Sequence, residues 1–252
     1  MGMFGGMIRL LLIALLALTP ASAVAAERGA ILIFSHTTGY RHDSIPAGIA
    51  AIRSIAGRRG LAVVASEDPA MFAPDRLKRF RAIVLLSTTT DPKNPASEWL
   101  AGPRREALQR FVRGGGGVVA IHAAADSHYH WPWYGRLIGG RFARHPAGTP
   151  SGKVSLANPG HRVNRGLPGT TVRADEWYYF DDFDPGSTVL MTLDPASIGE
   201  ADVNPNPVSW VREVDGGRMF YTALGHTAGS YSEPFFLRHV GGGLDWVLAA
   251  PR

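Results

Sequence analysis

Four apolar runs rich in β-branched residues, separated by segments of helical periodicity, constrain the fold of this chain most strongly. Residues 30–35 read AILIFS, 61–65 LAVVA, 82–87 AIVLLS and 117–122 GVVAIH. Continuous runs of this kind predict strands that are buried on both faces. Helical segments are predicted at 44–60, 74–80 and 103–113. Because helices alternate with these strands, we expect an α/β fold with a parallel sheet and right-handed crossovers.

The second half of the chain is less regular. Further strands are predicted at 154–157, 171–177, 188–193, 208–214 and 218–224. A hairpin turn is expected at 215–217, and helices at 131–140 and from Ser232 onward. The sequence contains no internal repeat and no low-complexity linker. We therefore expect residues 27–252 to form a single domain.

The first 26 residues have the pattern of a secretory signal peptide. Arg9 precedes the apolar run 10–18, and small residues fill positions 21–26 with the A-x-A spacing of a cleavage site. A transmembrane helix needs roughly 20 apolar residues, which is more than this run provides. We expect cleavage after this segment, a periplasmic or secreted protein and no membrane span after cleavage. An uncleaved membrane anchor is the alternative.

Composition excludes several classes of function. The chain has no cysteine, which rules out disulfide scaffolds, thiolate metal sites and cysteine nucleophiles. Any metal must be held by His, Asp or Glu. The positive charges are scattered arginines without interleaved aromatic residues, so no nucleic-acid partner is expected. The glycine run 114–117 ends a helix and precedes a strand, so it is a cap and turn rather than a phosphate cradle, and neither nucleotide nor flavin is expected.

Histidines follow three of the predicted strands. His42 lies in the segment after the first strand, His122 ends the fourth, and His226 follows the strand 218–224. Ligands of open parallel sheets bind beyond the carboxyl ends of the strands. We therefore expect these three imidazoles to meet in one crevice.

Four longer stretches carry a family resemblance. They read SHTTGYRHDSIP, GVVAIHAAADSHYHWPWYGRLIGGRFARHP, DEWYYF and RMFYTALGHTAGSYSEPFFLRHVGGGLDW. Together they resemble the ThuA-like (trehalose-utilisation) family, a branch of the class I glutamine amidotransferase-like superfamily. The resemblance implies a flavodoxin-like three-layer sandwich with a mostly parallel central sheet. It also implies a role in the use of trehalose or a related disaccharide or oxidised glycoside.

The resemblance places His122 where the amidotransferases carry their nucleophilic cysteine, and His226 resembles their later histidine. Without a thiol a glutaminase mechanism is impossible. Carboxylates near the histidines in the matched motifs are Asp126, Asp175, Glu176 and Asp182. One divalent metal, zinc or similar, is a possible cofactor, with His122 and His226 as ligands and Glu176 or His42 completing the shell. The same groups without metal would serve as general acid and base, and both interpretations stay open.

The expected catalytic residues are His122, His226, Glu176, His42 and Asp126. Residues expected to bind the substrate are Arg41, Trp133, Tyr134, His145 and Tyr178, because aromatic faces and polar groups suit a sugar ring. Arg41 could equally pair with a loop carboxylate. His128 and His130 are interpreted as polar loop residues. We expect a hydrolase, lyase or isomerase acting on a small-molecule carbohydrate. A non-catalytic carbohydrate-binding protein is the alternative, and a structural protein without a ligand is a weaker one.

Overall fold

The computed structural model describes residues 1–2, 29–201 and 204–249. Within them, the main sheet has the strand order β2-β1-β3-β4-β11-β10-β9-β6-β7. The signal peptide expected at residues 1–26 lies almost entirely outside the described residues. No helix in the described ranges is long and apolar enough to cross a bilayer.

The first five strands in this order are parallel. They are β2 (Ala62–Ser66), β1 (Ala30–Phe34), β3 (Phe80–Leu86), β4 (Gly117–Ile121) and β11 (Gly217–Thr222). Every residue of β4 is buried, as the continuous apolar run predicted. The chain leaves β1 for β2 on one side and then returns to β3 on the other. This reversal of direction opens a crevice at the carboxyl ends of the strands.

The rest of the sheet is antiparallel. It contains β10 (Asn206–Val214), β9 (Thr188–Asp194), β6 (Ser151–Leu156) and β7 (Thr170–Ala174). The hairpin turn between β10 and β11 has positive φ at Asp215 (50°) and Gly216 (92°), the conformation that matches strand twist. A small separate sheet pairs β5 (Arg141–Arg144) with β8 (Tyr179–Asp181). The predicted strand 171–177 ends at Ala174, which leaves Asp175 and Glu176 in a loop.

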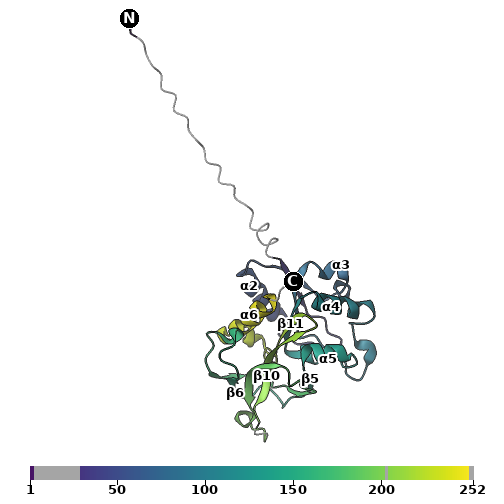
Figure 1. Ribbon diagram of the computed structural model, residues 1–252. Helices are drawn as coiled ribbons and strands as arrows, with labels where there is room; N and C mark the ends of the chain where they lie inside the picture. Colours follow the sequence, from purple (N-terminus) through teal and green to yellow (C-terminus); the bar gives the residue numbers. More distant parts are fainter. Residues whose placement is uncertain (3–28, 202–203, 250–252) are drawn as a thin grey trace.

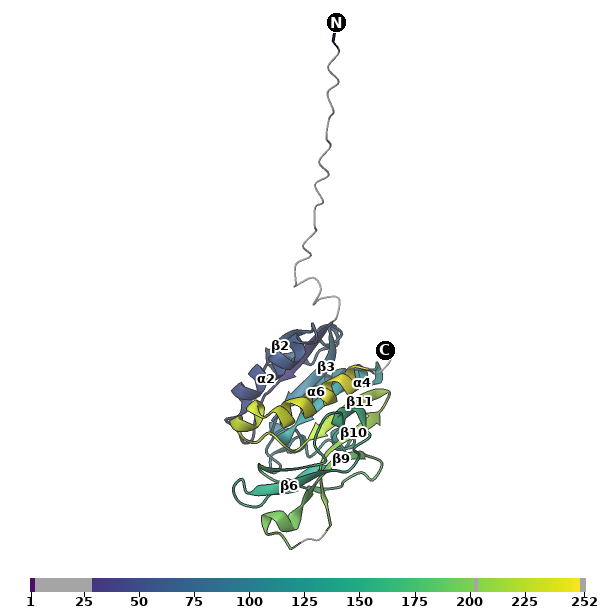
Figure 2. The ribbon, with the colours of Figure 1, turned by 90° about the vertical axis from the view of Figure 1, so that its left-hand side faces the viewer.

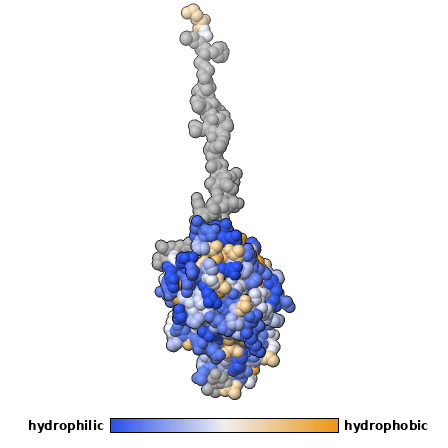
Figure 3. Space-filling model, turned by 90° about the vertical axis from the view of Figure 1, so that its right-hand side faces the viewer, coloured by the Kyte–Doolittle hydropathy of each residue, from blue (hydrophilic) through white to orange (hydrophobic). Residues whose placement is uncertain are grey.

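Helices cover both faces of the sheet and make three layers (Figures 1 and 2). The helices α2 (Ile45–Gly57) and α6 (Pro234–Leu248) lie on one face. On the other lie α3 (Pro74–Leu77), α4 (Pro103–Arg113) and α5 (Pro132–Ile138). The outer surface on the α3 and α4 side is mostly hydrophilic, with small scattered apolar spots (Figure 3). The α/β class and the three-layer arrangement of the prediction are confirmed.

Candidate functional site

His122 occupies a strained turn directly after β4. The chain passes from the strand into a short 3-10 helix (His122–Ala125), and His122 takes a φ of 53°. Positive φ is unfavourable for a residue with a Cβ and persists only where surrounding contacts enforce it. The Tyr221 hydroxyl donates to the His122 carbonyl at 2.9 Å, and Nδ1 of His122 donates to the Ala223 carbonyl at 2.7 Å. The Nδ1 proton leaves Nε2 of the neutral ring as an acceptor.

Four side chains from distant parts of the sequence converge around this acceptor. His42, His122, Glu176 and His226 each offer one ligand atom, and these atoms lie within 4.8 Å of one another. We call this group the ligand cluster. Nε2 of His122 lies 3.2 Å from Nδ1 of His226 and 3.4 Å from Oε2 of Glu176, and the last two atoms are 3.2 Å apart. The structure therefore brings together the three strand-end histidines and the expected carboxylate.

The electrostatics of the cluster favour an ionised Glu176 carboxylate beside the imidazoles. Burial acts to raise the pKa of Glu176, but the neighbouring imidazoles of His122 and His226 outweigh it and hold that pKa well below the usual range. The hydrogen bond with Glu176 raises the pKa of His226. Burial, together with the proximity of His122 and His226, lowers the pKa of His42 to about 3. The cluster thus combines an ionised carboxylate with imidazoles, one of them held neutral, as metal ligation requires.

The donor spacing also fits a metal ion. In a tetrahedral site with metal–ligand bonds of about 2.05 Å, neighbouring ligand atoms are about 3.3 Å apart. The three separations of 3.2–3.4 Å within the cluster match that edge. In addition, Nδ1 of His42 is buried and has no hydrogen-bond partner among the described residues. The residues present therefore fit a divalent cation.

Asp175 positions two members of the cluster without belonging to it. Its fully buried carboxylate accepts the backbone N–H groups of Gly225, His226 and Glu176, each at 3.0 Å. The guanidinium of Arg173, itself 3% exposed, pairs with the same carboxylate at 2.9 Å. Asp175 therefore ties the loop after β7 to the loop after β11. This tie holds Glu176 beside His226.

The ligand cluster opens into a cavity of about 350 Å³, which we call the inner pocket. Its lining residues are Tyr40, His42, Asp126, Phe142, His145, Glu176, Tyr178 and His226. A second hollow of about 610 Å³, the outer hollow, adjoins it and shares Tyr40, Asp126 and Phe142. Tyr40, which lines both spaces, is 65% exposed. The two spaces together form a cleft with an aromatic rim and a polar floor.

Asp126 and Tyr178 supply polar groups to the inner pocket. Burial raises the pKa of Asp126 to about 6, although the hydrogen bond from the Tyr129 hydroxyl opposes that change. Burial also holds the pKa of Tyr178 well above its ordinary value, so its hydroxyl keeps its proton. The ring of Tyr178 lies 4.5 Å from that of His122 and 4.3 Å from that of Phe142. His145 contributes Nδ1, which is 3.3 Å from Oε1 of Glu176.

Three residues expected to bind the substrate lie outside the inner pocket. Arg41 is exposed and pairs with Glu67 at 2.7 Å, the structural alternative that its sequence context left open. The indole N–H of Trp133 donates to Asp215 at 2.8 Å, and the Tyr134 hydroxyl donates to the Ala124 carbonyl at 2.8 Å. Both aromatic side chains are buried in the core. The geometry gives none of the three a role toward a ligand in the pocket.

Sequence reasoning missed Tyr40 and Phe142, which line both parts of the cleft. Each stands inside a matched motif, beside Arg41 and Arg141 respectively, and the motif was the only available signal. Asp175 was noted as a nearby carboxylate, but its positioning role was not predicted. That role depends on backbone donors contributed about 50 residues further along the chain.

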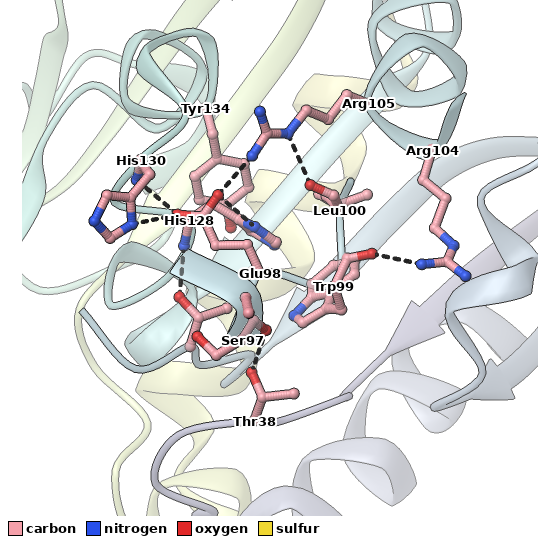
Figure 4. A network of polar contacts seen from close by, with 12 residues as sticks. Thr38, Ser97, Glu98, Trp99, Leu100, Arg104, Arg105, His128, His130 and Tyr134 are labelled. Atoms are coloured by element: carbon pink, nitrogen blue, oxygen red, sulfur yellow. Dashed lines mark hydrogen bonds and ion pairs between the residues drawn. The ribbon is translucent and has the colours of Figure 1, made fainter. Parts of the chain in front are cut away.

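Glu98 organises the loop that contains His128 and His130 (Figure 4). Its buried carboxylate accepts the backbone N–H of His130 at 2.6 Å and pairs with Arg105 at 2.7 Å. His128 is buried, and its Nδ1 lies 3.9 Å from the same carboxylate. These contacts give the segment a structural role. They also anchor the stretch of chain that leads from Asp126 to α5.

Comparison with known proteins gives a consistent picture. A family model described as ThuA, trehalose utilisation, matches residues 30–247. No curated protein matches the sequence. A solved protein from Bacteroides uniformis described as ThuA-like has a TM-score of 0.70 and 23% identity, covering 87% of this chain and 91% of that one. A ThuA-like protein from Parabacteroides merdae has a TM-score of 0.67 and 20% identity, covering 87% and 90%.

A more distant similarity concerns the fold alone. A protein from Thermoplasma acidophilum described as part of a GMP synthase has a TM-score of 0.50 and 11% identity, covering 86% of this chain and 96% of that one. This likeness agrees with the glutamine amidotransferase-like arrangement of the sheet. In that arrangement, His122 stands at the turn after the fourth parallel strand.

Proposed function

The chain belongs to the trehalose-utilisation (ThuA) family, and we propose that it is an exported enzyme of carbohydrate catabolism with a metal-assisted His/Glu site. Its substrate class is trehalose or a related disaccharide or oxidised glycoside. The reaction is a hydrolysis, an elimination or an isomerisation. A glutaminase reaction is excluded because the chain has no cysteine to form a thioester.

The triangle formed by Nε2 of His122, Nδ1 of His226 and Oε2 of Glu176 is the observation that carries this proposal. Two imidazoles and one carboxylate, with a further position open to solvent or substrate, are a donor set used by catalytic zinc sites. Because the Ala223 carbonyl fixes the tautomer of His122, its Nε2 lone pair is available to a cation. When bound, a divalent cation would lower the pKa of a water or substrate hydroxyl and polarise a carbonyl oxygen.

The other pocket residues orient the substrate and move protons. Glu176 balances the positive charge at the cluster. The hydroxyl of Tyr178 donates a hydrogen bond to a sugar oxygen, since its raised pKa keeps it protonated. Asp126 has a pKa of about 6, so it exchanges a proton more readily near neutral pH than an ordinary aspartate. Tyr40 offers a flat exposed face to the C–H face of a sugar ring.

Two connected spaces support a substrate larger than one sugar ring. The inner pocket of about 350 Å³ is lined by three of the four cluster residues, and the outer hollow of about 610 Å³ adjoins it. Asp126 lines both spaces. A disaccharide that spans them would expose its glycosidic oxygen near this carboxyl group. We infer that the outer hollow receives the leaving sugar or aglycone.

The test combines metal analysis with an assay of sugar turnover. Purified protein should contain about one equivalent of a divalent metal and should convert trehalose, its 3-keto form or a related disaccharide. His122→Ala and His226→Ala should each lose the metal and at least about a hundredfold in turnover. His161→Gln is the matched control, because His161 lines neither space of the cleft. Turnover at the wild-type level in both alanine variants would overturn the proposal.

A further inference from the structure

A larger hollow lies on the α2 and α6 face of the sheet and shares no lining residue with the inner pocket. Its volume is about 640 Å³. It is bordered by the C-terminal end of α2, the segment 162–165 and one side of α6. Figure 2 shows α2 and α6 on this face. We call this space the arginine hollow.

Positive charge dominates the arginine hollow. Five arginines line it, at positions 58, 59, 162, 165 and 238, against one acidic residue, Asp245. Arg59 already pairs with Asp245, because it donates to both of its carboxylate oxygens at 2.5 and 2.7 Å. The remaining four arginines therefore line the hollow without a countercharge from its other lining residues.

The partners of these four arginines are neutral or absent. Arg58 donates to the Ser54 hydroxyl at 2.7 Å, and Arg162 donates to the Trp246 carbonyl at 3.1 Å. Neither Arg165 nor Arg238 forms an ion pair with any acid in the described part of the chain. Guanidinium groups pair bidentately with phosphate and carboxylate when such groups are available. Among the described residues, these four guanidinium groups form no such pair.

Glycines allow the walls of the hollow to approach closely. A Cβ on Gly242 would lie 2.4 Å from the Val163 carbonyl oxygen, so only glycine lets the 162–165 segment rest on α6. A Cβ on Gly166 would lie 3.1 Å from Nη1 of Arg238, and Gly166 has a φ of 75°. Gly242 lies in the run of glycines 241–243 within α6, and glycines inside a helix reduce its stability unless close packing requires them. The close packing at Gly166 and Gly242 places Arg165 and Arg238 in the lining of the same hollow.

We propose that the arginine hollow binds a phosphate-bearing anion with at least two negative charges. The volume falls within the range of small-molecule sites. Several converging guanidinium forks suit phosphate oxygens better than they suit a neutral sugar. The phosphate groups belong either to a free small molecule or to a lipid headgroup. The site is separate from the ligand cluster, so it does not depend on the proposed enzymatic activity.

The first experiment is calorimetric titration of the intact protein with inorganic pyrophosphate, at an ionic strength held constant with chloride. Wild type should bind pyrophosphate, and Arg165→Ser/Arg238→Ser should bind at least about tenfold more weakly. The matched control, Arg79→Ser/Arg136→Ser, removes the same charge from the opposite face and should stay within about twofold. Equal affinity in both double variants, or no binding by wild type, would overturn the proposal.

A second arm identifies the source of the phosphate. Co-sedimentation with phosphatidylglycerol vesicles, with phosphatidylcholine vesicles as reference, tests the lipid headgroup. Vesicle binding that pyrophosphate displaces assigns the hollow to a headgroup, whereas pyrophosphate binding without vesicle binding assigns it to a free phosphate compound. The Arg165→Ser/Arg238→Ser variant should keep the wild-type melting temperature and metal content, because both residues are exposed and line a hollow that shares no residue with the inner pocket. A variant that loses its fold would instead lower both.

Discussion

Replacing Asp175 by Asn should destabilise the fold and disassemble the ligand cluster together. Oδ1 of Asp175 accepts two backbone N–H groups, from Glu176 and His226. Oδ2 accepts the Arg173 guanidinium and the N–H of Gly225. An asparagine amide has one acceptor oxygen, so in either orientation its NH2 group faces at least two buried donors.

The magnitude follows from those lost contacts. A buried donor left without a partner costs about 1–3 kcal/mol, and breaking a buried ion pair costs about 3–5 kcal/mol. Arg173 keeps a second partner, Glu233, at 3.3 Å, which reduces the penalty. We expect Asp175→Asn to lower the free energy of unfolding by about 4 kcal/mol. It should also weaken metal binding, because Glu176 and His226 lose their common anchor.

Urea unfolding followed by tryptophan fluorescence measures the first effect, and titration with a divalent cation measures the second. The matched control is Glu233→Gln, which removes the second acidic partner of Arg173. That carboxylate is 40% exposed, so its loss should cost less than about 1 kcal/mol. If Asp175→Asn changed stability by less than about 1 kcal/mol and kept wild-type metal affinity, the positioning role would be refuted.

The buried histidines outside the site should make the protein acid-sensitive: burial lowers the pKa of both His128 and His239 to about 3. Both histidines stay neutral in the folded state, but below about pH 6.5 they take up protons when the chain unfolds. The free energy of unfolding therefore has its full value above that pH and decreases as the pH falls toward 3. At pH 5 the loss should be about 2 kcal/mol per histidine. Equal unfolding free energies at pH 7 and pH 5 would contradict this. Tyr40→Ala should raise KM for the sugar about fivefold with little change in kcat, given about 1 kcal/mol for a lost aromatic contact. Val172→Ala, at another exposed apolar residue, should leave KM unchanged, and an equal effect of both substitutions would count against the aromatic rim.

The parallel half of the sheet could be predicted because each of its first four strands is a continuous apolar run, and three of them are buried on both faces. The small sheet of β5 and β8 could not. Its strands have four and three residues and are only partly buried, so they carry no apolar period. The sequence pattern also did not predict that β7 ends at Ala174. Asp175 turns the chain there by binding backbone groups from a distant loop.

The convergence of the strand-end histidines followed from topology alone, since parallel strands share one carboxyl edge. Aromatic residues were harder to place. Trp133 and Tyr134 stand in a segment that could form either core or rim, and their polar atoms found partners inside the protein. Tyr40, by contrast, is exposed at the cleft. Which aromatic residue faces solvent depends on tertiary packing that a local pattern does not encode.

An anomalous-difference map from crystals of the protein soaked in zinc, recorded at the zinc edge, tests the ligand cluster most directly. The account predicts one strong peak about 2.0–2.2 Å from Nε2 of His122, Nδ1 of His226 and a carboxylate oxygen of Glu176. A map with no peak between these three atoms, or with zinc only at surface histidines, would contradict it.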